Sequence, residues 1–377
     1  MEKRIVLTGG PGSGKTTVIN NIVNIFSSLG VKVIVVPETA TEIITSGIKP
    51  FGEDPVDMLA FQELVLKQQL SKEKVIDDAV KMYTTKYPDK DFLIIYDRGT
   101  INNKSYITDE VFMDVLKKVT NKNNYSELLN KYDLVIGLVG AKEFYTLENN
   151  SARSESPDYA LKLGERTLKS WVGHPKLKIV GPKEHMEDKV NEVANYINEL
   201  LNKKSVKNQR KYLVDLSLTD LKYISENATP VYIKQVYLKS NNNEEKRLRK
   251  TVIDSSPLYE LTIYEYLDDG RKVLKSSKKL DEKMYNELLS FKIDGSKVIS
   301  KYRLYFSYQE TYMYLDLFED GIMNPDDAIL EINVTDNENI VIPPFIKVVE
   351  EVSNNHEFDN YSKSIESINK KLKRVIS

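Results

Sequence analysis

Residues 9–16 read Gly-Gly-Pro-Gly-Ser-Gly-Lys-Thr, a complete G-x-x-x-x-G-K-[ST] phosphate-binding loop. An apolar run at residues 5–8 precedes the loop. The residues that follow it at helical spacing are Val18, Ile19, Ile22, Val23, Phe26 and Leu29. The loop therefore joins a buried strand to a helix, where glycines let backbone N–H groups approach phosphate oxygens and the helix N-terminus adds positive potential. This arrangement predicts binding of a nucleoside triphosphate.

Each residue of the loop, and the one after it, is a candidate ligand of the nucleotide. These residues are Gly9, Gly10, Pro11, Gly12, Ser13, Gly14, Lys15, Thr16 and Thr17. We expect Lys15 to reach the β- and γ-phosphates, and we expect the hydroxyl of Thr16 to bind Mg²⁺. The expected cofactors are therefore Mg²⁺ and either ATP or GTP.

The composition limits the class of protein. The chain has 377 residues and a net charge of −2, which argues against a protein that coats nucleic acid. It contains no cysteine, which excludes disulfides and zinc–thiolate sites. Its histidines number only 3, so we expect any metal to be Mg²⁺ or Mn²⁺ on oxygen ligands. No apolar run approaches the roughly 20 residues that span a bilayer, and we expect a soluble, cytoplasmic protein.

The distribution of apolar runs predicts two domains and a tail. In residues 1–203, strand-like runs alternate with helical segments, which predicts an α/β domain with a parallel sheet covered by helices. In residues 205–362, tyrosine becomes frequent and short alternating runs predict an antiparallel β-barrel domain of the α+β class. Residues 363–377 predict a basic amphipathic helix, which either packs on its own domain or touches an anionic membrane.

Two strands of the first domain end in charged residues. One ends in Asp97-Arg98-Gly99 and another in Pro37-Glu38. Both belong to the carboxyl edge of the sheet, where doubly wound folds bind their ligands. Asp97 is a candidate for holding Mg²⁺, Arg98 for binding a phosphate or carboxylate of an acceptor, and Glu38 for accepting a hydroxyl proton or orienting water. The alternative is that these residues only cap the elements that follow them.

Two arginines lie farther along the chain, on a helical segment. Arg153 belongs to Ala-Arg-Ser-Glu at residues 152–155, and Arg166 follows it. Their position is typical of a closing lid that brings guanidinium groups to the charge on a transferred phosphoryl group. The complete catalytic set that we predict is Lys15, Glu38, Asp97, Arg98, Arg153 and Arg166.

An ordered set of motifs in residues 1–200 resembles a known family. The set is the phosphate loop, Val-Pro-Glu-Thr-Ala-Thr, Asp-Arg-Gly, Ala-Arg-Ser-Glu and Trp-Val-Gly-His-Pro. It resembles the kinase-like P-loop ATPases grouped with the ATPase domain of the bacterial NAD-biosynthesis regulator. Two departures stand out: Asn102 replaces the usual acid after Asp-Arg-Gly, and Val180-Gly181-Pro182 replaces the usual Asp-Asn ending. The second leaves the choice between ATP and GTP open.

Charged residues in the second domain recur at strand spacing. Arg247 and Arg249 alternate along one run, and Lys301 and Arg303 along another, so each pair faces one side of its strand. If the sheet closes, such residues line a tunnel for a polyanion. If it does not, they are the solvent-facing charges of an ordinary sheet. The candidate tunnel residues are Lys211, Lys234, Arg247, Arg249, Lys301, Arg303 and Glu331.

The order of these segments resembles the CYTH, or triphosphate tunnel, superfamily. The resemblance rests on Arg-Lys-Tyr-Leu-Val, Arg-Leu-Arg-Lys, Lys-Tyr-Arg, Leu-Asp-Leu-Phe and Leu-Glu-Ile-Asn. Catalytic members begin with Glu-x-Glu-x-Lys, whose carboxylates hold a metal. Here that stretch is Gln-Arg-Lys at residues 209–211, preceded by Lys-Asn, and both acids are missing. The resemblance therefore implies binding of a phosphate-rich ligand rather than hydrolysis.

Three functions follow from these motifs. The first is Mg²⁺-dependent hydrolysis of a nucleoside triphosphate, or phosphoryl transfer from it to a small phosphorylated acceptor. The second is a nucleotide-regulated module that binds a phosphorylated ligand or a phospholipid with little catalysis. The third is an active tunnel triphosphatase. We prefer the first.

Overall fold

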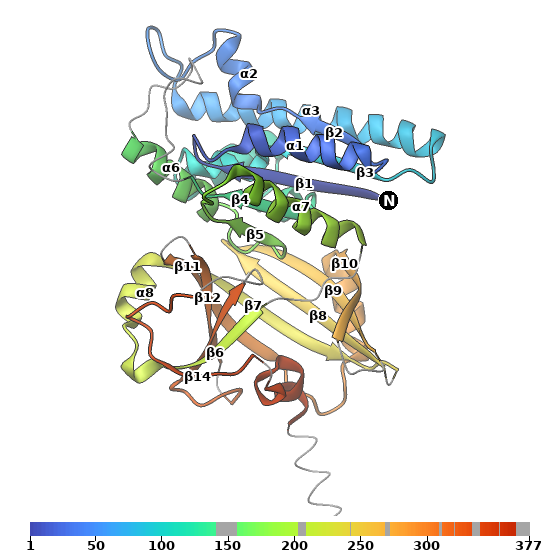
Figure 1. The fold of residues 1–377 in the computed structure, drawn as a ribbon, viewed down its shortest axis with the longest axis vertical. Helices are drawn as coiled ribbons and strands as arrows, with labels where there is room; N and C mark the ends of the chain where they lie inside the picture. Colours follow the sequence, from blue (N-terminus) through green and yellow to red (C-terminus); the bar gives the residue numbers. More distant parts are fainter. Residues whose placement is uncertain are drawn as a thin grey trace, which may run out of the picture. The chain divides into compact units, whose positions relative to one another are not determined.

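The computed structural model describes residues 1–140, 157–202, 209–241, 243–267, 272–308, 311–319, 321–333, 340–353 and 355–366. The chain divides into two compact units, Met1–Leu201 and Asn202–Ser377 (Figure 1). Each unit is described below by itself.

The first unit contains a parallel five-stranded sheet with the order β2-β3-β1-β4-β5. Its strands are β1 (Glu2–Gly9), β2 (Lys32–Val36), β3 (Phe92–Asp97), β4 (Leu134–Leu138) and β5 (Leu177–Val180). The central strands are continuous apolar runs, as expected of a parallel sheet that is buried on both faces. This confirms the parallel sheet that the alternation of elements predicted.

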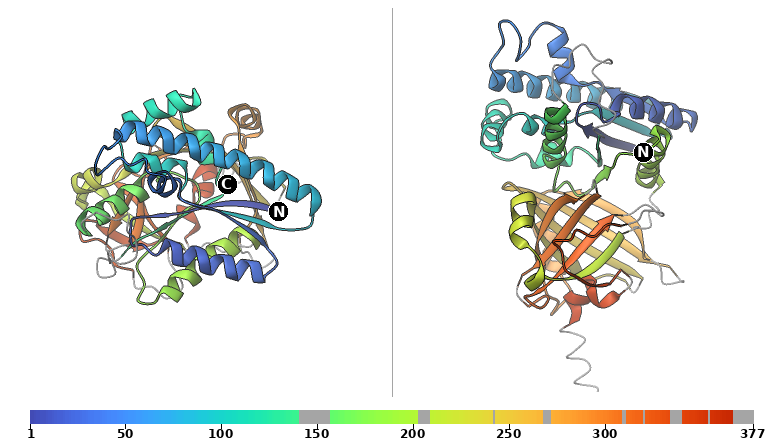
Figure 2. Two further views of the ribbon diagram at one scale, coloured as in Figure 1. Left: turned by 90° about the horizontal axis from the view of Figure 1, so that it is seen from above. Right: turned by 60° about the vertical axis from the view of Figure 1, so that its left-hand side comes forward.

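Helices cover both faces of this sheet (Figure 2, left). The helices are α1 (Lys15–Ser28), α2 (Thr39–Thr45), α3 (Met58–Lys86), α4 (Asp109–Thr120), α5 (Ser126–Asn130), α6 (Pro157–Lys169) and α7 (Met186–Asn202), with a 3-10 turn η1 (Thr100–Ser105) after β3. On one face, α1 and α7 share a core with the sheet, to which Phe26 and Ile197 contribute fully buried side chains. On α3, the Asp57 carboxylate caps the helix by accepting from the N–H groups of Leu59 and Ala60. The apolar stripes of α1 and α7 thus fix the helix that the phosphate loop begins.

The second unit contains an antiparallel nine-stranded sheet with the order β10-β9-β8-β7-β11-β12-β13-β6-β14. Its strands are β6 (Gln209–Asp215), β7 (Thr229–Leu238), β8 (Glu244–Ile253), β9 (Ser256–Tyr266), β10 (Lys272–Leu280), β11 (Ile299–Tyr308), β12 (Thr311–Phe318), β13 (Asp327–Asn333) and β14 (Val348–Glu351). Its helices include α8 (Leu221–Asn227) and α9 (Glu282–Leu288). The antiparallel class of this unit agrees with the prediction.

The predicted barrel is not closed. Strands β10 and β14 are the two ends of the sheet, and no pairing joins them within the described ranges. The reason lies in the edge strands themselves. β14 has only 4 residues. β10 reads Lys-Val-Leu-Lys-Ser-Ser-Lys-Lys-Leu, and lysines along an edge strand oppose further pairing. The second unit is therefore a curled open sheet (Figure 2, right).

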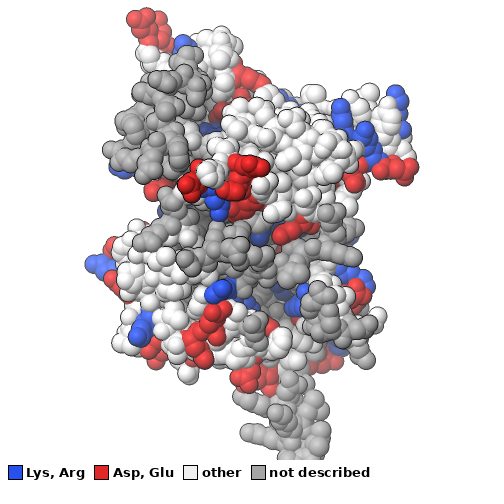
Figure 3. All heavy atoms as spheres, in the orientation of Figure 1, with Lys and Arg blue, Asp and Glu red and all other residues white. Residues whose placement is uncertain are grey.

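Charged side chains of both signs lie scattered among uncharged ones on the face drawn in Figure 3. None of the helices that the structure describes is both long and apolar enough to cross a membrane. The predicted C-terminal helix at residues 363–377 lies for the most part outside the described residues.

Candidate functional site

The phosphate loop runs from the end of β1 into α1, as predicted. Gly9, Gly12 and Gly14 have φ angles of 144°, 75° and 84°. A Cβ atom on Gly9 would collide with the carbonyl oxygen of Leu138 at the end of β4. Glycine is therefore required at position 9 both for the backbone conformation and for the approach of the two strands.

The loop leaves donors for an anion. Helix α1 begins at Lys15 with Gly14 as its N-cap, and no side chain caps its first N–H groups. Uncapped N–H groups at a helix N-terminus bind anions such as phosphate. The Lys15 ammonium lies over the loop, 3.0 Å from the carbonyl oxygen of Gly9 and 3.1 Å from that of Gly10. The buried hydroxyl oxygen of Ser13 has no hydrogen-bond partner. These features fit the phosphates of a nucleotide.

Glu38 and Arg98 meet at the carboxyl edge of the sheet. The Nε atom of Arg98 lies 2.7 Å from Oε1 of Glu38, and its Nη1 atom donates to the Tyr106 hydroxyl at 3.0 Å. Arg98 adopts the left-handed region with φ 65°, which is uncommon for a residue with a side chain. Such backbone strain is typical of functional sites, where surrounding contacts hold the residue in place.

Asp97 is the last residue of β3 and lies opposite Leu7 of β1, the strand that leads into the loop. Burial raises the pKa of its carboxyl group, Lys15 and Arg98 lower it, and Glu38 raises it further. Its Oδ1 atom is buried without a hydrogen-bond partner. A buried carboxylate oxygen that the protein does not satisfy is a position for a metal ion or a bound ligand. The structure thus brings Lys15, Glu38, Asp97 and Arg98 within electrostatic range of one another.

The donor set near the loop fits Mg²⁺. Asp97 offers an orphaned carboxylate oxygen, and Thr16 is exposed at the start of α1. Magnesium commonly takes one or two protein oxygens and completes its shell with phosphate oxygens and water. No group of three or more His, Cys, Asp or Glu side chains that suits a metal occurs among the described residues.

Two further lysines, one beside Pro37 and one beside the phosphate loop, were not predicted from the sequence. The Lys72 ammonium, on α3, lies 2.7 Å from the carbonyl oxygen of Pro37 and 2.9 Å from Oε2 of Glu42. Lys189, on α7, is buried and contacts the carbonyl oxygens of Ser13 and Val139 at 3.3 and 2.8 Å. Neither belongs to a motif, because their roles arise from packing between elements distant in sequence.

The structure describes only one of the two predicted lid arginines. Arg153 lies outside the described residues. Arg166, on α6, is exposed, and its Nη2 atom lies 3.5 Å from the carbonyl oxygen of Ile107. His174, which the sequence places in a Gly-His-Pro turn, is buried between the Tyr132 carbonyl and the Lys176 N–H, at 3.1 and 3.2 Å. That histidine has a structural environment rather than a catalytic one.

The predicted tunnel residues of the second unit fall largely on one face of its sheet. Residues directly opposite each other on paired strands share a face. The register places Lys211 opposite Glu331, Arg303 opposite Asp316, and Gln235 opposite Arg249. By alternation along β7, β8 and β11, this charged face carries all the predicted residues except one, namely Lys211, Arg247, Arg249, Lys301, Arg303 and Glu331. Lys234 is the exception, because it is exposed on the opposite face of β7 from buried Ile233 and Gln235.

Most cations of the charged face already have anionic partners. The buried Asp316 carboxylate contacts the Lys301 ammonium, and it accepts two hydrogen bonds of 2.7 Å from Arg303. Arg303 also contacts Oε2 of Glu331 at 2.7 Å. The Lys211 ammonium lies 2.7 Å from Oδ1 of Asp359. The carboxylates of this face therefore neutralise the protein's own cations.

Arg247 and Arg249 differ from their neighbours. No ion pair within the described ranges includes either guanidinium, and the Nε atom of Arg247 is buried without a partner. Arg247 lies over the Tyr264 ring, with its Cζ atom 5.3 Å from the centroid. With its amide oxygen turned toward Arg249, Gln235 accepts from Nε at 3.0 Å and from Nη2 at 2.7 Å. Burial, and then the charge of Arg247, lower the pKa of Arg249.

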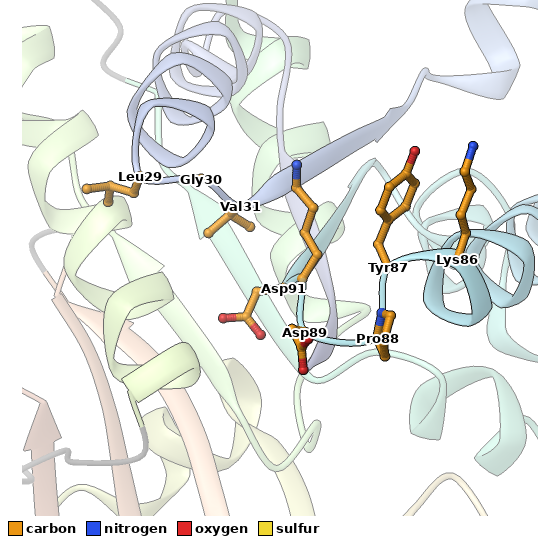
Figure 4. A pocket seen from close by; sticks show the side chains of 9 residues that line it. Leu29, Gly30, Val31, Lys86, Tyr87, Pro88, Asp89 and Asp91 are labelled. Atoms are coloured by element: carbon orange, nitrogen blue, oxygen red, sulfur yellow. The ribbon is translucent and has the colours of Figure 1, made fainter.

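The first unit also has a hollow, which lies away from its phosphate loop. It measures about 590 Å³ and is lined by residues 29–31 and 86–91 (Figure 4). These residues precede β2 and β3, so the hollow lies at the amino edge of the sheet, opposite the phosphate loop. Its side chains include Asp89, Asp91 and Tyr87, which Figure 4 shows pointing in different directions. We assign it no function.

Residues 4–189 match a family model described as an AAA domain. The match contains the phosphate loop, Glu38, Asp97 and Arg98. No curated protein matches the chain.

Among solved structures, an inorganic triphosphatase is 19% identical, with 42% of this chain and 96% of that chain covered and a TM-score of 0.31. A protein of Pyrococcus horikoshii is 12% identical, with coverages of 44% and 89% and a TM-score of 0.26. A protein of Pyrococcus furiosus is 19% identical, with coverages of 34% and 79% and a TM-score of 0.25. Likenesses at these TM-scores establish neither fold nor function.

Proposed function

We propose that the first unit binds a nucleoside triphosphate with Mg²⁺ and either hydrolyses it or transfers its terminal phosphoryl group to a small acceptor. One observation carries the proposal: a phosphate loop with an uncapped helix N-terminus lies within electrostatic range of a buried, partly unsatisfied carboxylate, Asp97. Phosphoryl transfer depends on positioning and on charge stabilisation rather than on covalent chemistry by the protein. A cluster of this composition supplies both.

Each residue has a distinct role in this proposal. Lys15 and the loop N–H groups bind the phosphates, while Thr16 and Asp97 would hold Mg²⁺, which neutralises charge on the phosphate oxygens when bound. Arg98 orients the acceptor and Glu38 accepts its hydroxyl proton or positions water. The ion pair between Glu38 and Arg98 keeps the base next to the group that orients the acceptor. Arg153 and Arg166 remain candidates for stabilising the transferred group.

The test is turnover of ATP and GTP with Mg²⁺, with and without a panel of nucleosides, nucleotides and phosphorylated metabolites. The wild type is compared with Lys15→Ala and with Lys67→Ala, a control that replaces a lysine on α3 whose side chain is 54% exposed. Turnover that needs one acceptor, survives in Lys67→Ala and disappears in Lys15→Ala would identify a kinase and its substrate. Equal nucleotide binding by the wild type and Lys15→Ala would contradict the proposed site.

We propose further that the second unit binds a phosphate-rich ligand without metal. Arg247 and Arg249 support this because no carboxylate of the described residues pairs with them, whereas Asp316 and Glu331 are engaged with Lys301 and Arg303. A carboxylate held by a bidentate arginine is a poor metal ligand, and this favours binding over hydrolysis.

The arrangement of Arg247 and Arg249 also supports a second function. In that function the protein is a nucleotide-regulated module that binds a phosphorylated ligand or a phospholipid headgroup. Acceptor-dependent consumption of nucleotide would favour the enzyme. Slow turnover that no acceptor increases, together with tight binding of inositol phosphates or of vesicles that contain anionic lipid, would favour the module.

A further inference from the structure

The buried side chain of Asn102 contacts three separate parts of the first unit. Asn102 lies in η1 and is 3% exposed. Its Oδ1 atom accepts from the N–H of Gly99 at 2.9 Å and from Nε1 of Trp171 at 3.2 Å. Its Nδ2 atom donates to the hydroxyl oxygen of Thr8 at 2.7 Å. The protein therefore engages both the oxygen and the nitrogen of this amide.

The three partners of Asn102 belong to the elements that make up the proposed site. Thr8 is the residue of β1 immediately before the phosphate loop. Gly99 completes the turn that carries Asp97 and Arg98, and it also accepts from the Asn102 N–H at 3.0 Å. Trp171 follows the end of α6. One buried amide thus links the loop, the turn and the segment after α6.

Close contacts hold these parts together on either side of the amide. A Cβ atom on Gly99 would lie 2.8 Å from the ring of Trp171, so the indole packs directly on the turn. A Cβ atom on Gly164 of α6 would lie 3.5 Å from Cα of Gly10 in the phosphate loop. Because interiors are close-packed, a shift of the loop against α6 must be accommodated along this row of contacts.

We propose that Asn102 is a positioning residue that fixes the phosphate loop against the Asp97 turn and α6, and that nucleotide binding at the loop therefore changes the environment of Trp171. This inference rests on the proposed nucleotide site. It extends that site, because it gives Asn102 and Trp171 a role that does not require contact with the nucleotide.

The chain has a built-in reporter, because Trp171 is its only tryptophan. The experiment titrates the full chain with Mg·ATP and Mg·GTP while the emission of Trp171 is recorded, and nucleotide binding is measured in parallel by equilibrium dialysis. The test variant is Asn102→Leu, which keeps the size of the side chain and removes all three hydrogen bonds. The matched control is Asn103→Leu. Asn103 is equally buried in η1, but its Nδ2 atom donates to Gln69 and to the carbonyl oxygen of Thr100, not to Thr8 or Trp171.

We expect the emission of Trp171 to change in the wild type and in Asn103→Leu. The change should occur over the same nucleotide concentrations at which equilibrium dialysis shows binding. We expect Asn102→Leu to lose most of that change at saturating nucleotide. A second variant, Thr8→Val, removes only the contact with β1 and should lose the change as well, which keeps the test valid if Asn102→Leu fails to fold.

Two results would overturn the inference. One is a wild type that saturates with nucleotide in dialysis while its Trp171 emission stays constant. The other is a full emission change in Thr8→Val or in folded Asn102→Leu. Failure of the wild type to bind any nucleotide is a separate outcome, because it refutes the proposed nucleotide site and this inference with it.

Discussion

The two units treat the carboxylates of Asp97 and Asp316 in opposite ways. At the carboxyl edge of the parallel sheet, the Asp97 carboxylate and the Ser13 hydroxyl are buried with atoms that the protein leaves unsatisfied. On the charged face of the antiparallel sheet, Asp316 contacts both Lys301 and Arg303. Unsatisfied buried polar atoms are uncommon and indicate a missing partner, whereas a buried ion pair satisfies itself. A buried carboxylate therefore indicates a missing partner only where the protein has not already neutralised it.

The largest effect should come from breaking the self-neutralised network. Asp316→Asn leaves Lys301 and Arg303 as buried cations that share one remaining acid, and loss of one partner of a buried ion pair typically costs about 3–5 kcal/mol. The control is Asp294→Asn, whose partner Lys239 and own side chain are 56% and 87% exposed. Chemical denaturation should show a large loss of stability for Asp316→Asn and almost none for the control. Equal stability of the two variants would show that the network is not a structural one.

The next effect concerns the unsatisfied carboxylate. Asp97→Asn should reduce Mg²⁺-dependent turnover by about 10²–10³-fold, since it weakens the charge that would hold the metal. Burial raises the pKa of Asp97 above its ordinary value of 3.8, so ionisation costs stability at neutral pH. The variant should therefore melt at a higher temperature than the wild type at pH 7, and the difference should disappear as the pH falls below 3.8.

The control for this change is Asp78→Asn, an exposed substitution on α3. It should alter neither turnover nor the pH dependence of melting. An Asp97→Asn variant that is both inactive and less stable at neutral pH would contradict the account, because the carboxylate would then have a structural partner.

A smaller effect is expected for ligand binding by Arg247 and Arg249, the cations of the charged face that are not in ion pairs among the described residues. Arg249→Leu should weaken binding of inorganic triphosphate by about 10–100-fold, which corresponds to one or two charge-assisted hydrogen bonds of roughly 1.5–3 kcal/mol each. Lys234→Ala is the matched control, since Lys234 lies on the opposite face. Equal loss of binding in both variants would place the ligand elsewhere.

The last prediction is a dependence of stability on pH. Burial lowers the pKa of Lys301 from 10.5 to about 8. Between these values the unfolded chain binds the proton more tightly, so this group adds stability as the pH rises from about 8 to 10.5. The difference in unfolding free energy between the wild type and Lys301→Met should therefore grow over this interval. A constant or falling difference would show that Asp316 keeps Lys301 fully charged.

The residues that the structure brings together in the first unit could be chosen from the sequence because their information is local. The phosphate loop, Glu38, Asp97 and Arg98 each follow a strand directly, and parallel topology then brings the strand ends together. Lys72 and Lys189 could not be predicted, because they reach the site from helices whose packing depends on the whole unit. The exchange of an acid for Asn102 was visible in sequence, but its contacts with Thr8 and Trp171 join residues far apart in the chain.

The charged face of the second unit was harder to predict from the sequence, because its contacts also depend on residues far apart in the chain. Alternation along single strands identified most of the charged face, but strand pairing decides which cation meets which acid. The register that sets Arg303 opposite Asp316 is a long-range property, and so is the absence of pairing between β10 and β14 among the described residues. Lys234 was misplaced because a run of mixed residues on β7 does not reveal which face is buried.

The most direct test of the account is release of phosphate from ATP, GTP and inorganic triphosphate in the presence of Mg²⁺ or Mn²⁺, by the wild type and by Lys15→Ala. We predict that Lys15→Ala abolishes release from the nucleotides and that neither protein releases phosphate from inorganic triphosphate, even though both bind it. Release from inorganic triphosphate by Lys15→Ala would contradict the account, because it would show that the charged face of the second unit is itself a catalytic centre.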